Sequence, residues 1–188
     1  MTELTPQWKQ FKSGTDIRGI ASEGGPAPIN LTDEAVGRMA DGFILWLARR
    51  SGKRCEQLVV SIGHDSRLSG PRLKASVIER LNRAGCRVFD CGLSSTPAMF
   101  QSTHALSCDG AIQLTASHHP FYRNGLKFFT PDGGLDATDI EAILMAAQDG
   151  RSPDAMPGGT IQTVEFMRQY AATLRQMICD GVGGAHPL

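Results

Sequence analysis

The stretch that decides the fold is Thr115-Ala116-Ser117-His118-His119-Pro120, because an apolar run stands on each side of it. Gly110-Ala111-Ile112-Gln113-Leu114 leads into it, and Leu126-Lys127-Phe128-Phe129 leads out. Short apolar runs bounded by turn residues are typical of buried strands, so the polar residues between them are expected on a loop. Loops on a rigid scaffold often carry the chemistry of a protein. The stretch therefore predicts a sheet with a functional loop between two of its strands.

A single hydroxyl on this loop lies among cationic and titratable groups. Ser117 is followed by His118 and His119, and Arg123 and Lys127 come shortly after them. Phosphoryl transfer needs positive groups, usually with a divalent ion, around an oxygen nucleophile. A serine hydrolase usually has a strained Gly-x-Ser-x-Gly elbow, whereas alanine and histidine flank this serine. The residue types therefore favour phosphoryl transfer.

Two features of the loop leave alternatives open. Lys127 lies on the next predicted strand and faces Ser117 only if the loop folds back; Asn124-Gly125, a dipeptide typical of tight turns, is expected to shape that return. The adjacent imidazoles of His118 and His119 suggest a metal site. However, neighbouring side chains on an extended loop diverge, and no nearby carboxylate or cysteine completes a coordination shell, so metal ligation is the weaker interpretation.

The run Thr-Ala-Ser-His-His-Pro-x-x-x-Asn-Gly-x-Lys resembles the phosphoserine loop of the α-D-phosphohexomutases, the phosphomannomutase/phosphoglucomutase enzymes. The family pattern usually reads Thr-(Ala/Gly)-Ser-His-Asn-Pro, so His119 stands where asparagine is commoner. Two other stretches are similar to family motifs: residues 13–19, Ser-Gly-Thr-Asp-Ile-Arg-Gly, and residues 63–69, Gly-His-Asp-Ser-Arg-Leu-Ser. Three motifs in the family's order, from Phe11 to about Ile143, make the resemblance specific.

The resemblance implies a mutase that interconverts hexose 6-phosphate and hexose 1-phosphate, with mannose or glucose as the sugar. Ser117 would be carried as a phosphoserine and would donate its phosphoryl group to the substrate. Hexose 1,6-bisphosphate would then be the intermediate and activator. Mg²⁺ would be held by the phosphoryl oxygens on Ser117 and by carboxylates of a second domain.

The resemblance also assigns roles to single residues. Lys127 would move a proton or steady the transferring group, and Arg18 would clamp phosphate, although alone it reads as an ordinary surface arginine. His118 would orient the loop or contact phosphate. Asp65 and Arg67 invite a catalytic interpretation, but an ion pair that shapes their loop explains them equally well.

Strands alternate with helices along the chain, which favours a three-layer α/β/α fold. The resemblance adds that the sheet is mixed, mostly parallel and four-stranded. Residues 1–150 are expected to form the phosphoserine-bearing domain, and 151–188 a linker and helix that lead to an absent second domain. The chain is then expected to be an N-terminal fragment that is inactive alone.

Local signals predict single elements along the chain. They indicate an irregular arm to about Asn30, a Thr32 helix cap, a helix opening at Gly70-Pro71, a Thr138/Glu141 capping box and a last helix over about 164–179.

Composition excludes several function classes. The 188 residues include 19 basic and 19 acidic side chains, so the formal net charge is zero and nothing favours nucleic acid or an anionic membrane. The five cysteines form no Cys-x-x-Cys pair, which favours reduced and mostly buried thiols. Because the sequence has neither a leader pattern nor an apolar span, a cytoplasmic protein is expected.

Two other function classes stay open. The chain could be a module that captures phosphosugars or a protein partner without turnover, or a hydrolase that uses Ser117 with a histidine. The last helix carries Phe166, Tyr170, Leu174 and Met177 along one side. An apolar side without a partner would favour self-association, which sedimentation at high concentration would test.

Overall fold

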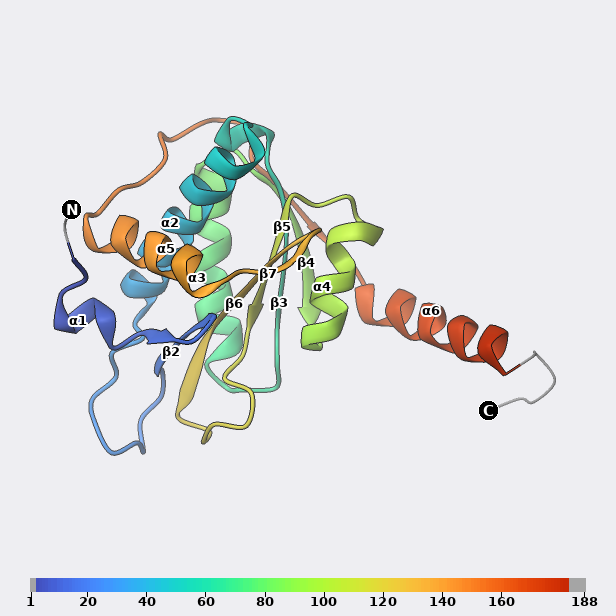
Figure 1. The fold of residues 1–188 in the computed structure, drawn as a ribbon, viewed down its shortest axis with the longest axis horizontal. Helices are drawn as coiled ribbons and strands as arrows, with labels where there is room; N and C mark the ends of the chain where they lie inside the picture. The colour runs from blue at the N-terminus through green and yellow to red at the C-terminus, as the bar shows by residue number, and fades with distance from the viewer. Residues whose placement is uncertain (1–2, 183–188) are drawn as a thin grey trace.

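A computed structural model describes residues 3–182, which form a mixed β-sheet with helices on both faces (Figure 1). The three-layer α/β/α fold expected from the sequence is confirmed. The strands are β1 (Lys12–Ser13), β2 (Asp16–Ile20), β3 (Val59–His64), β4 (Arg87–Leu93), β5 (Gly110–Leu114), β6 (Arg123–Thr130), β7 (Gly133–Gly134) and β8 (Thr160–Thr163). The helices are α1 (Pro6–Lys9), α2 (Asp33–Ser51), α3 (Gly70–Arg83), α4 (Thr96–Ala105), α5 (Ala137–Gln148) and α6 (Phe166–Gly181), with a short 3-10 turn at Cys55–Gln57.

The sheet has the strand order β1-β2-β6-β5-β3-β4-β8, and β7 pairs with β6. β5, β3, β4 and β8 are parallel to their neighbours in this part of the sheet, whereas β6 runs antiparallel to both β5 and β2. The sheet is mixed, as expected, but it has eight strands instead of four. The extra strands are short or polar, so they form no apolar run that a sequence pattern could show.

The arm before Asn30 is not irregular, because it contains β1 and β2. β2 pairs with β6 and places Arg18 opposite Gly125 and Ile17 opposite Leu126. Only Ile17 and Ile20 have large apolar side chains in this five-residue segment, and its pairing with β6 makes it a strand. Arg18 is therefore a buried residue of the sheet, with 4% of its surface exposed, and not a surface arginine.

β8 was not expected from the sequence either. It follows the Pro- and Gly-containing loop at residues 149–159 and extends the sheet beside β4. All four of its residues are exposed. The division of the chain at residue 150 stays a prediction.

The start of the helix agrees with the sequence prediction for α2 and α3 but not for α5. The Thr32 hydroxyl accepts a hydrogen bond from the backbone N–H of Ala35, and Pro71 lies in the first turn of α3, both as expected. The capping box of α5 is formed by Asp136 and Asp139 instead of Thr138 and Glu141. The helix begins earlier than expected because the Asp136 carboxylate accepts two backbone hydrogen bonds in its first turn.

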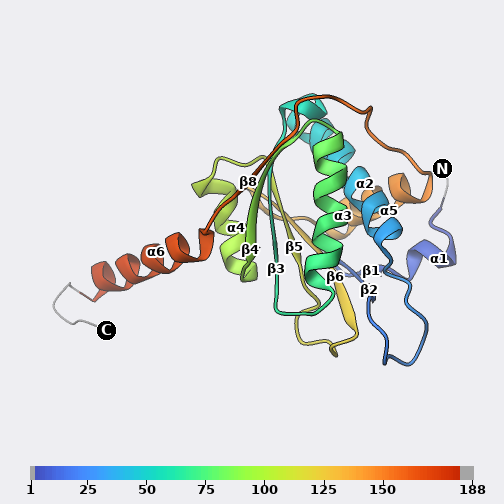
Figure 2. The ribbon, with the colours of Figure 1, turned by 180° about the vertical axis from the view of Figure 1, so that it is seen from behind.

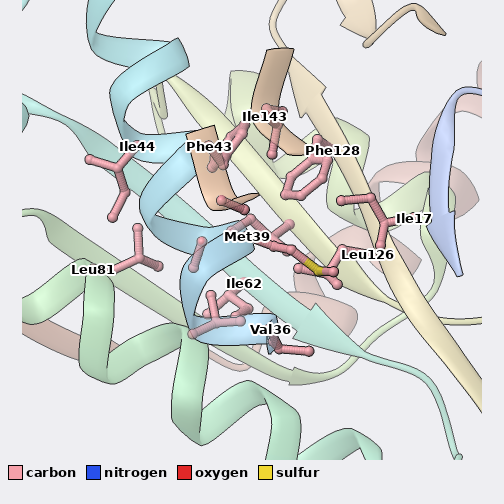
Figure 3. Packing of buried hydrophobic residues seen from close by; sticks show 14 of the residues in the cluster. Ile17, Val36, Met39, Phe43, Ile44, Ile62, Leu81, Leu126, Phe128 and Ile143 are labelled. Carbon is pink, nitrogen blue, oxygen red and sulfur yellow. The ribbon is translucent and has the colours of Figure 1, made fainter. Parts of the chain in front are cut away.

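The main core lies between the sheet and the layer formed by α2, α3 and α5 (Figure 3). Phe43 of α2 stacks on Phe128 of β6 with ring centroids 4.6 Å apart, and Leu126 is buried in the same cluster. Because side chains alternate across a strand, Lys127 between these two residues faces the opposite side of the sheet. A smaller core on that side contains Ala98, Met99, Phe129 and Phe166.

The last helix, α6, extends away from the sheet (Figures 1 and 2). Phe166 at its start is buried, but Leu174, Met177 and Ile178 are 39%, 61% and 47% exposed. The apolar side of the helix is therefore largely uncovered in the described chain. Self-association through it stays a prediction.

Three of the five cysteines are buried free thiols, Cys86, Cys91 and Cys108. Burial raises the pKa of each to about 12, so these thiols stay protonated at neutral pH. Cys55 and Cys179 are partly exposed and also unpaired. Over residues 3–182, no helix has the length and apolarity needed to span a bilayer.

Gly125 allows β2 and β6 to pair closely, and we predict that Gly125→Ala destabilises the fold. An added Cβ would stand 2.0 Å from the Ile17 carbonyl oxygen and 2.9 Å from Cδ of Arg18. The free energy of unfolding should fall by about 1–3 kcal/mol in urea denaturation. The control is Gly134→Ala, whose Cβ would meet nothing closer than the Phe128 carbonyl oxygen at 4.0 Å. Equal stability of the two variants would contradict the close pairing.

Candidate active site

The predicted functional loop connects β5 to β6 at the carboxyl end of β5, on the side of the sheet where β3 also ends (Figure 1). The two loops at this edge are joined directly, because the backbone N–H of Asp65 donates to the Leu114 carbonyl oxygen at 2.9 Å. In open α/β sheets, ligands bind beyond the carboxyl ends of parallel strands. Ser117 therefore lies where such a fold ordinarily places its ligand.

One guanidinium group organises the Ser117 loop. Nη1 of Arg67 donates to the carbonyl oxygens of Pro120 at 2.8 Å and Arg123 at 3.0 Å. Its Nη2 donates to the carbonyl oxygens of Ser117 at 2.8 Å and His119 at 2.7 Å. A planar guanidinium suits this geometry because its donors point in fixed directions.

Asp65 holds the arginine in place. Its Oδ2 accepts from Nε of Arg67 at 3.2 Å, and its Oδ1 accepts from the backbone N–H of Arg67 at 3.1 Å. Asp65 and Arg67 therefore have the geometry of an ion pair that shapes the loop. Nε and the backbone N–H of Arg67 bind Asp65, while Nη1 and Nη2 bind carbonyl oxygens of the loop. The contribution of these two residues to activity stays a prediction.

Ser117 has a left-handed backbone conformation, with φ of 53°. This conformation is strained for a residue with a side chain and costs about 1–3 kcal/mol. The Thr115 hydroxyl oxygen accepts the Ser117 N–H at 3.0 Å, and Arg67 holds the Ser117 carbonyl, so both backbone polar groups are fixed. The side chain is exposed.

The two histidines differ in their surroundings. The Ser117 Oγ is 3.4 Å from Nδ1 of His118, a long contact for a hydrogen bond. The rings of His118 and His119 stack with centroids 5.0 Å apart. Burial lowers the pKa of His119, and the nearby charge of Arg123 lowers it further, followed by His118, Arg18 and Arg67. The neutral form of His119 is therefore favoured.

Arg18 and Lys127, which the sequence predicts at one site, are brought together by the Asp16 carboxylate. Oδ1 of Asp16 is 2.8 Å from Nζ of Lys127, and Oδ2 is 2.6 Å from Nη2 of Arg18. Sequence analysis did not identify Asp16. The signal that could have found it is alternation, because Asp16 and Arg18 lie two residues apart and share one face of β2.

The strands that carry Arg18 and Lys127 adjoin the start of the Ser117 loop. The backbone N–H of Thr115 donates to the carbonyl oxygen of Gly125, which is opposite Arg18. Arg18 passes across Gly125 and donates from Nη1 to the Ile17 carbonyl oxygen at 3.0 Å. Burial lowers the pKa of Arg18, and the Asp16 carboxylate opposes this effect. The roles of Arg18 and Lys127 toward a ligand stay predictions.

Asn124 and Gly125 do not form the expected turn, because both are buried residues of β6. The chain turns earlier, where the Arg123 N–H donates to the Pro120 carbonyl oxygen at 3.0 Å. Asn124 instead donates from Nδ2 to the Ser69 hydroxyl at 2.9 Å and so joins β6 to the start of α3. Gly125 allows β2 to approach β6 closely, and Asn124 forms this hydrogen bond, so neither residue has its expected role in a turn.

A pocket of about 470 Å³ lies beside Ser117, between its loop, the loop after β3 and the segment at residues 22–23. Its walls are formed by Ser22, Glu23, Asp65, Ser66, Arg67, Leu68, Ser117, His119 and Phe121. A larger hollow of about 970 Å³ beside α5 has no serine or histidine in its lining. Within residues 3–182, no three His, Cys, Asp or Glu side chains are grouped as a metal site would require.

Fold and loop together define an α/β/α domain that carries an exposed serine on a loop next to the strands that hold Arg18 and Lys127. The family model described as phosphoglucomutase/phosphomannomutase, alpha/beta/alpha domain I, matches residues 9–152. The chain therefore belongs to the phosphoglucomutase/phosphomannomutase family, and the resemblance seen in its three motifs is confirmed.

Similar proteins agree with this assignment. Phosphoglucosamine mutases of Pediococcus pentosaceus and Lacticaseibacillus casei are 32% and 33% identical over 182 residues, covering 92% of this chain. The chain spans 38% of the length of each of them. A phosphoglucomutase/phosphomannomutase family protein from Burkholderia thailandensis has the same fold, with a TM-score of 0.73, 22% identity and coverage of 92% of this chain and 36% of that one. A putative phosphomannomutase from Thermus thermophilus also has this fold, with a TM-score of 0.65 and 22% identity. That match covers 86% of this chain and 34% of the other.

We predict that Arg67→Gln loosens the Ser117 loop and destabilises the protein. The variant loses hydrogen bonds to four carbonyl oxygens, so the free energy of unfolding should fall by about 2–3 kcal/mol. Hydrogen exchange of the amides at residues 115–123 should become faster. The control is Arg151→Gln, because Arg151 pairs only with Asp149 and is 69% exposed. Unchanged exchange in the Arg67 variant would contradict the clamp.

The His119 ring gives a second, pH-dependent prediction. An NMR titration should place its pKa below 6.5, and Arg123→Gln should raise it because protonated His119 then loses a repelling neighbour. The Arg151→Gln protein should show the wild-type His119 titration. A pKa of His119 that is the same with and without the Arg123 guanidinium would show that the two groups are not neighbours in solution.

Proposed function

We propose that Ser117 is the phosphoryl-carrying residue of a hexose phosphate mutase. The observation that supports this most is the pairing of Arg18 and Lys127 on the Asp16 carboxylate, on two strands that adjoin the start of the loop that carries Ser117. Fixed positive charge next to an exposed hydroxyl favours a phosphoryl group there in both the bound and the transferring state. The substrate is a hexose 6-phosphate or 1-phosphate, and the names of the similar proteins favour glucosamine over mannose and glucose.

In the proposed reaction, the bond between phosphorus and the Ser117 oxygen breaks while a bond to a hydroxyl of the hexose monophosphate forms. The proton of that hydroxyl passes to the serine oxygen, and the sugar becomes a 1,6-bisphosphate. After the sugar reorients, the Ser117 oxygen accepts the other phosphoryl group and returns a proton. Phosphoserine is thus regenerated, and the isomeric monophosphate is released.

The contacts of Lys127, Arg18 and His118 suggest a different role for each in the proposed reaction. Lys127 donates to a carboxylate, so its ammonium group is best suited to steadying the transferring phosphoryl group. Arg18 has its side chain fixed at both Asp16 and Ile17 and so holds a defined position for a phosphate oxygen. His118 is near enough to Ser117 to orient the hydroxyl or to contact the phosphoryl group.

We also propose Mg²⁺ as the metal of this reaction. A bound Mg²⁺ neutralises charge on the transferring group. The chemistry of this chain fits one part of such a site, because phosphoryl oxygens on Ser117 are the hard ligands that Mg²⁺ prefers. The further carboxylate ligands would have to come from outside the described residues. On this proposal the 188-residue chain accepts a phosphoryl group but does not isomerise sugar phosphates alone, and steady isomerisation by it would contradict this.

A serine hydrolase is the second candidate, because Ser117 and His118 are neighbours. In a hydrolase triad a carboxylate orients the histidine. Among residues 3–182, no carboxylate accepts a hydrogen bond from His118, and its contact with Ser117 is long. The site geometry therefore favours phosphoryl transfer. A binding module that captures phosphosugars without turnover would use the same pocket and differs only in lacking phosphoserine.

Intact-mass analysis after expression in cells tests the proposed function. We expect a fraction of the chain to carry one phosphoryl group, and Ser117→Ala to remove it entirely. Ser66→Ala is the matched control, because Ser66 is exposed and lines the same pocket. Absence of phosphoserine even after incubation with hexose 1,6-bisphosphate would support the binding module. Labelling of Ser117 by a fluorophosphonate probe would support the hydrolase.

A further inference from the structure

At the end of the Ser117 loop, the Arg123 side chain is a cation without a partner among residues 3–182. Its backbone is fully engaged, since its N–H donates to Pro120 and its carbonyl oxygen accepts from Arg67. Its guanidinium forms neither a hydrogen bond nor an ion pair with any residue of the described chain, and its Nε is shielded from solvent. A buried donor of a charged group without an acceptor is costly, so an acceptor is expected.

Arg38 is the other arginine of residues 3–182 with a buried Nε that lacks a partner, and it shows by contrast that the state of Arg123 is unusual. Its Nη2 donates to the Gln148 carbonyl oxygen at 2.7 Å, and its guanidinium lies 4.9 Å from the centre of the Trp8 ring. Arg123 has no comparable compensation in the part of the chain that the structure describes.

Strand geometry places Arg123 beside Arg18. Residues two apart on a strand share a face, so Arg123, Gly125 and Lys127 lie on the same side of β6. β2 runs alongside with Ile20 opposite Arg123 and Arg18 opposite Gly125. The two arginines are therefore diagonal neighbours on one face. Their proximity is consistent with the influence of Arg123 on the pKa values of Arg18 and His119.

Charge around the loop is unbalanced in a way that favours an anion. Asp65 neutralises Arg67, and the single carboxylate of Asp16 is shared by Arg18 and Lys127. Arg123 adds a further positive charge, with which no carboxylate of residues 3–182 forms an ion pair. Clustered like charges repel one another, and a phosphate dianion between them would remove that cost and provide acceptors for guanidinium donors.

We propose that Arg123 is a further anion-binding residue of this site, donating to the oxygens of a phosphate dianion next to Ser117. The dianion is either the phosphoryl group carried on Ser117 or the phosphate of a bound sugar. The inference rests on the proposed function for its ligand, and it adds a residue that the three sequence motifs do not include as a functional group.

The first arm of the test uses the chain with phosphoserine introduced at position 117 by an expanded genetic code. A ³¹P NMR titration then reports the second ionisation of the phosphoserine, whose ordinary pKa is about 6. Arg123→Gln should raise this pKa by about 0.5 or more, because the dianion loses a cationic neighbour. Arg123→Lys should keep most of the wild-type value, and Arg151→Gln should keep all of it.

The second arm uses the unphosphorylated chain, titrated with glucose 6-phosphate and with inorganic phosphate while the Ser117 amide signal is followed. Weaker binding in Arg123→Gln, by about threefold or more, assigns the residue to an incoming phosphate. A change in the first arm alone assigns it to the phosphoryl group on Ser117. If neither arm responds in variants that keep the wild-type unfolding midpoint, the inference is wrong.

The two proposals can fail separately. A chain that acquires no phosphoserine in cells, but whose introduced phosphoserine responds to Arg123→Gln, contradicts the mutase function and retains the anion site. A chain that is phosphorylated on Ser117 in cells, with titrations insensitive to Arg123, retains the function and contradicts the role of Arg123.

Discussion

The structure of the site depends on one guanidinium group that binds four backbone carbonyl oxygens. Arg67 gathers the carbonyls of Ser117, His119, Pro120 and Arg123, which a loop without regular hydrogen bonding would otherwise leave to solvent. The strained backbone of Ser117 persists because this clamp fixes its carbonyl and Thr115 fixes its N–H. The backbone of Ser117 is thereby fixed, while its side chain stays exposed. Positioning of this kind is the main requirement of phosphoryl transfer.

The second constraint is the close pairing of β2 with β6. Gly125 leaves room for Arg18 to lie flat on the sheet, and Asp16 then holds Arg18 and Lys127 by separate carboxylate oxygens. One face of these strands fills the hydrophobic core, so the alternating residues necessarily collect on the other face. The cationic cluster is therefore a direct result of strand alternation. The segments that form β2 and β6 therefore supply both the cationic side chains on one face and apolar core residues on the other.

The sequence predicted the parts of this arrangement that follow from local pattern. Apolar runs located β3, β5 and β6, and the Ser117 stretch identified both the loop and the family. β2 and β8 were missed because each becomes a strand only through pairing with a distant neighbour. Asn124 and Gly125 were misread as a turn, since local propensity cannot show that Arg18 packs on Gly125. Asp16 was missed because the segment that it shares with Arg18 was not predicted to be a strand, so the alternation that places both side chains on one face was not applied.

A crystal structure of the chain with phosphoserine at position 117 tests the central claim most directly. The account predicts that the phosphoryl oxygens lie within roughly 2.7–3.2 Å of donor nitrogens from the cluster of Arg18, Arg123 and Lys127. It also predicts that the Arg67 contacts to the loop carbonyls remain in place. A phosphoryl group that projects into solvent, beyond hydrogen-bonding distance of all three side chains, would contradict the account.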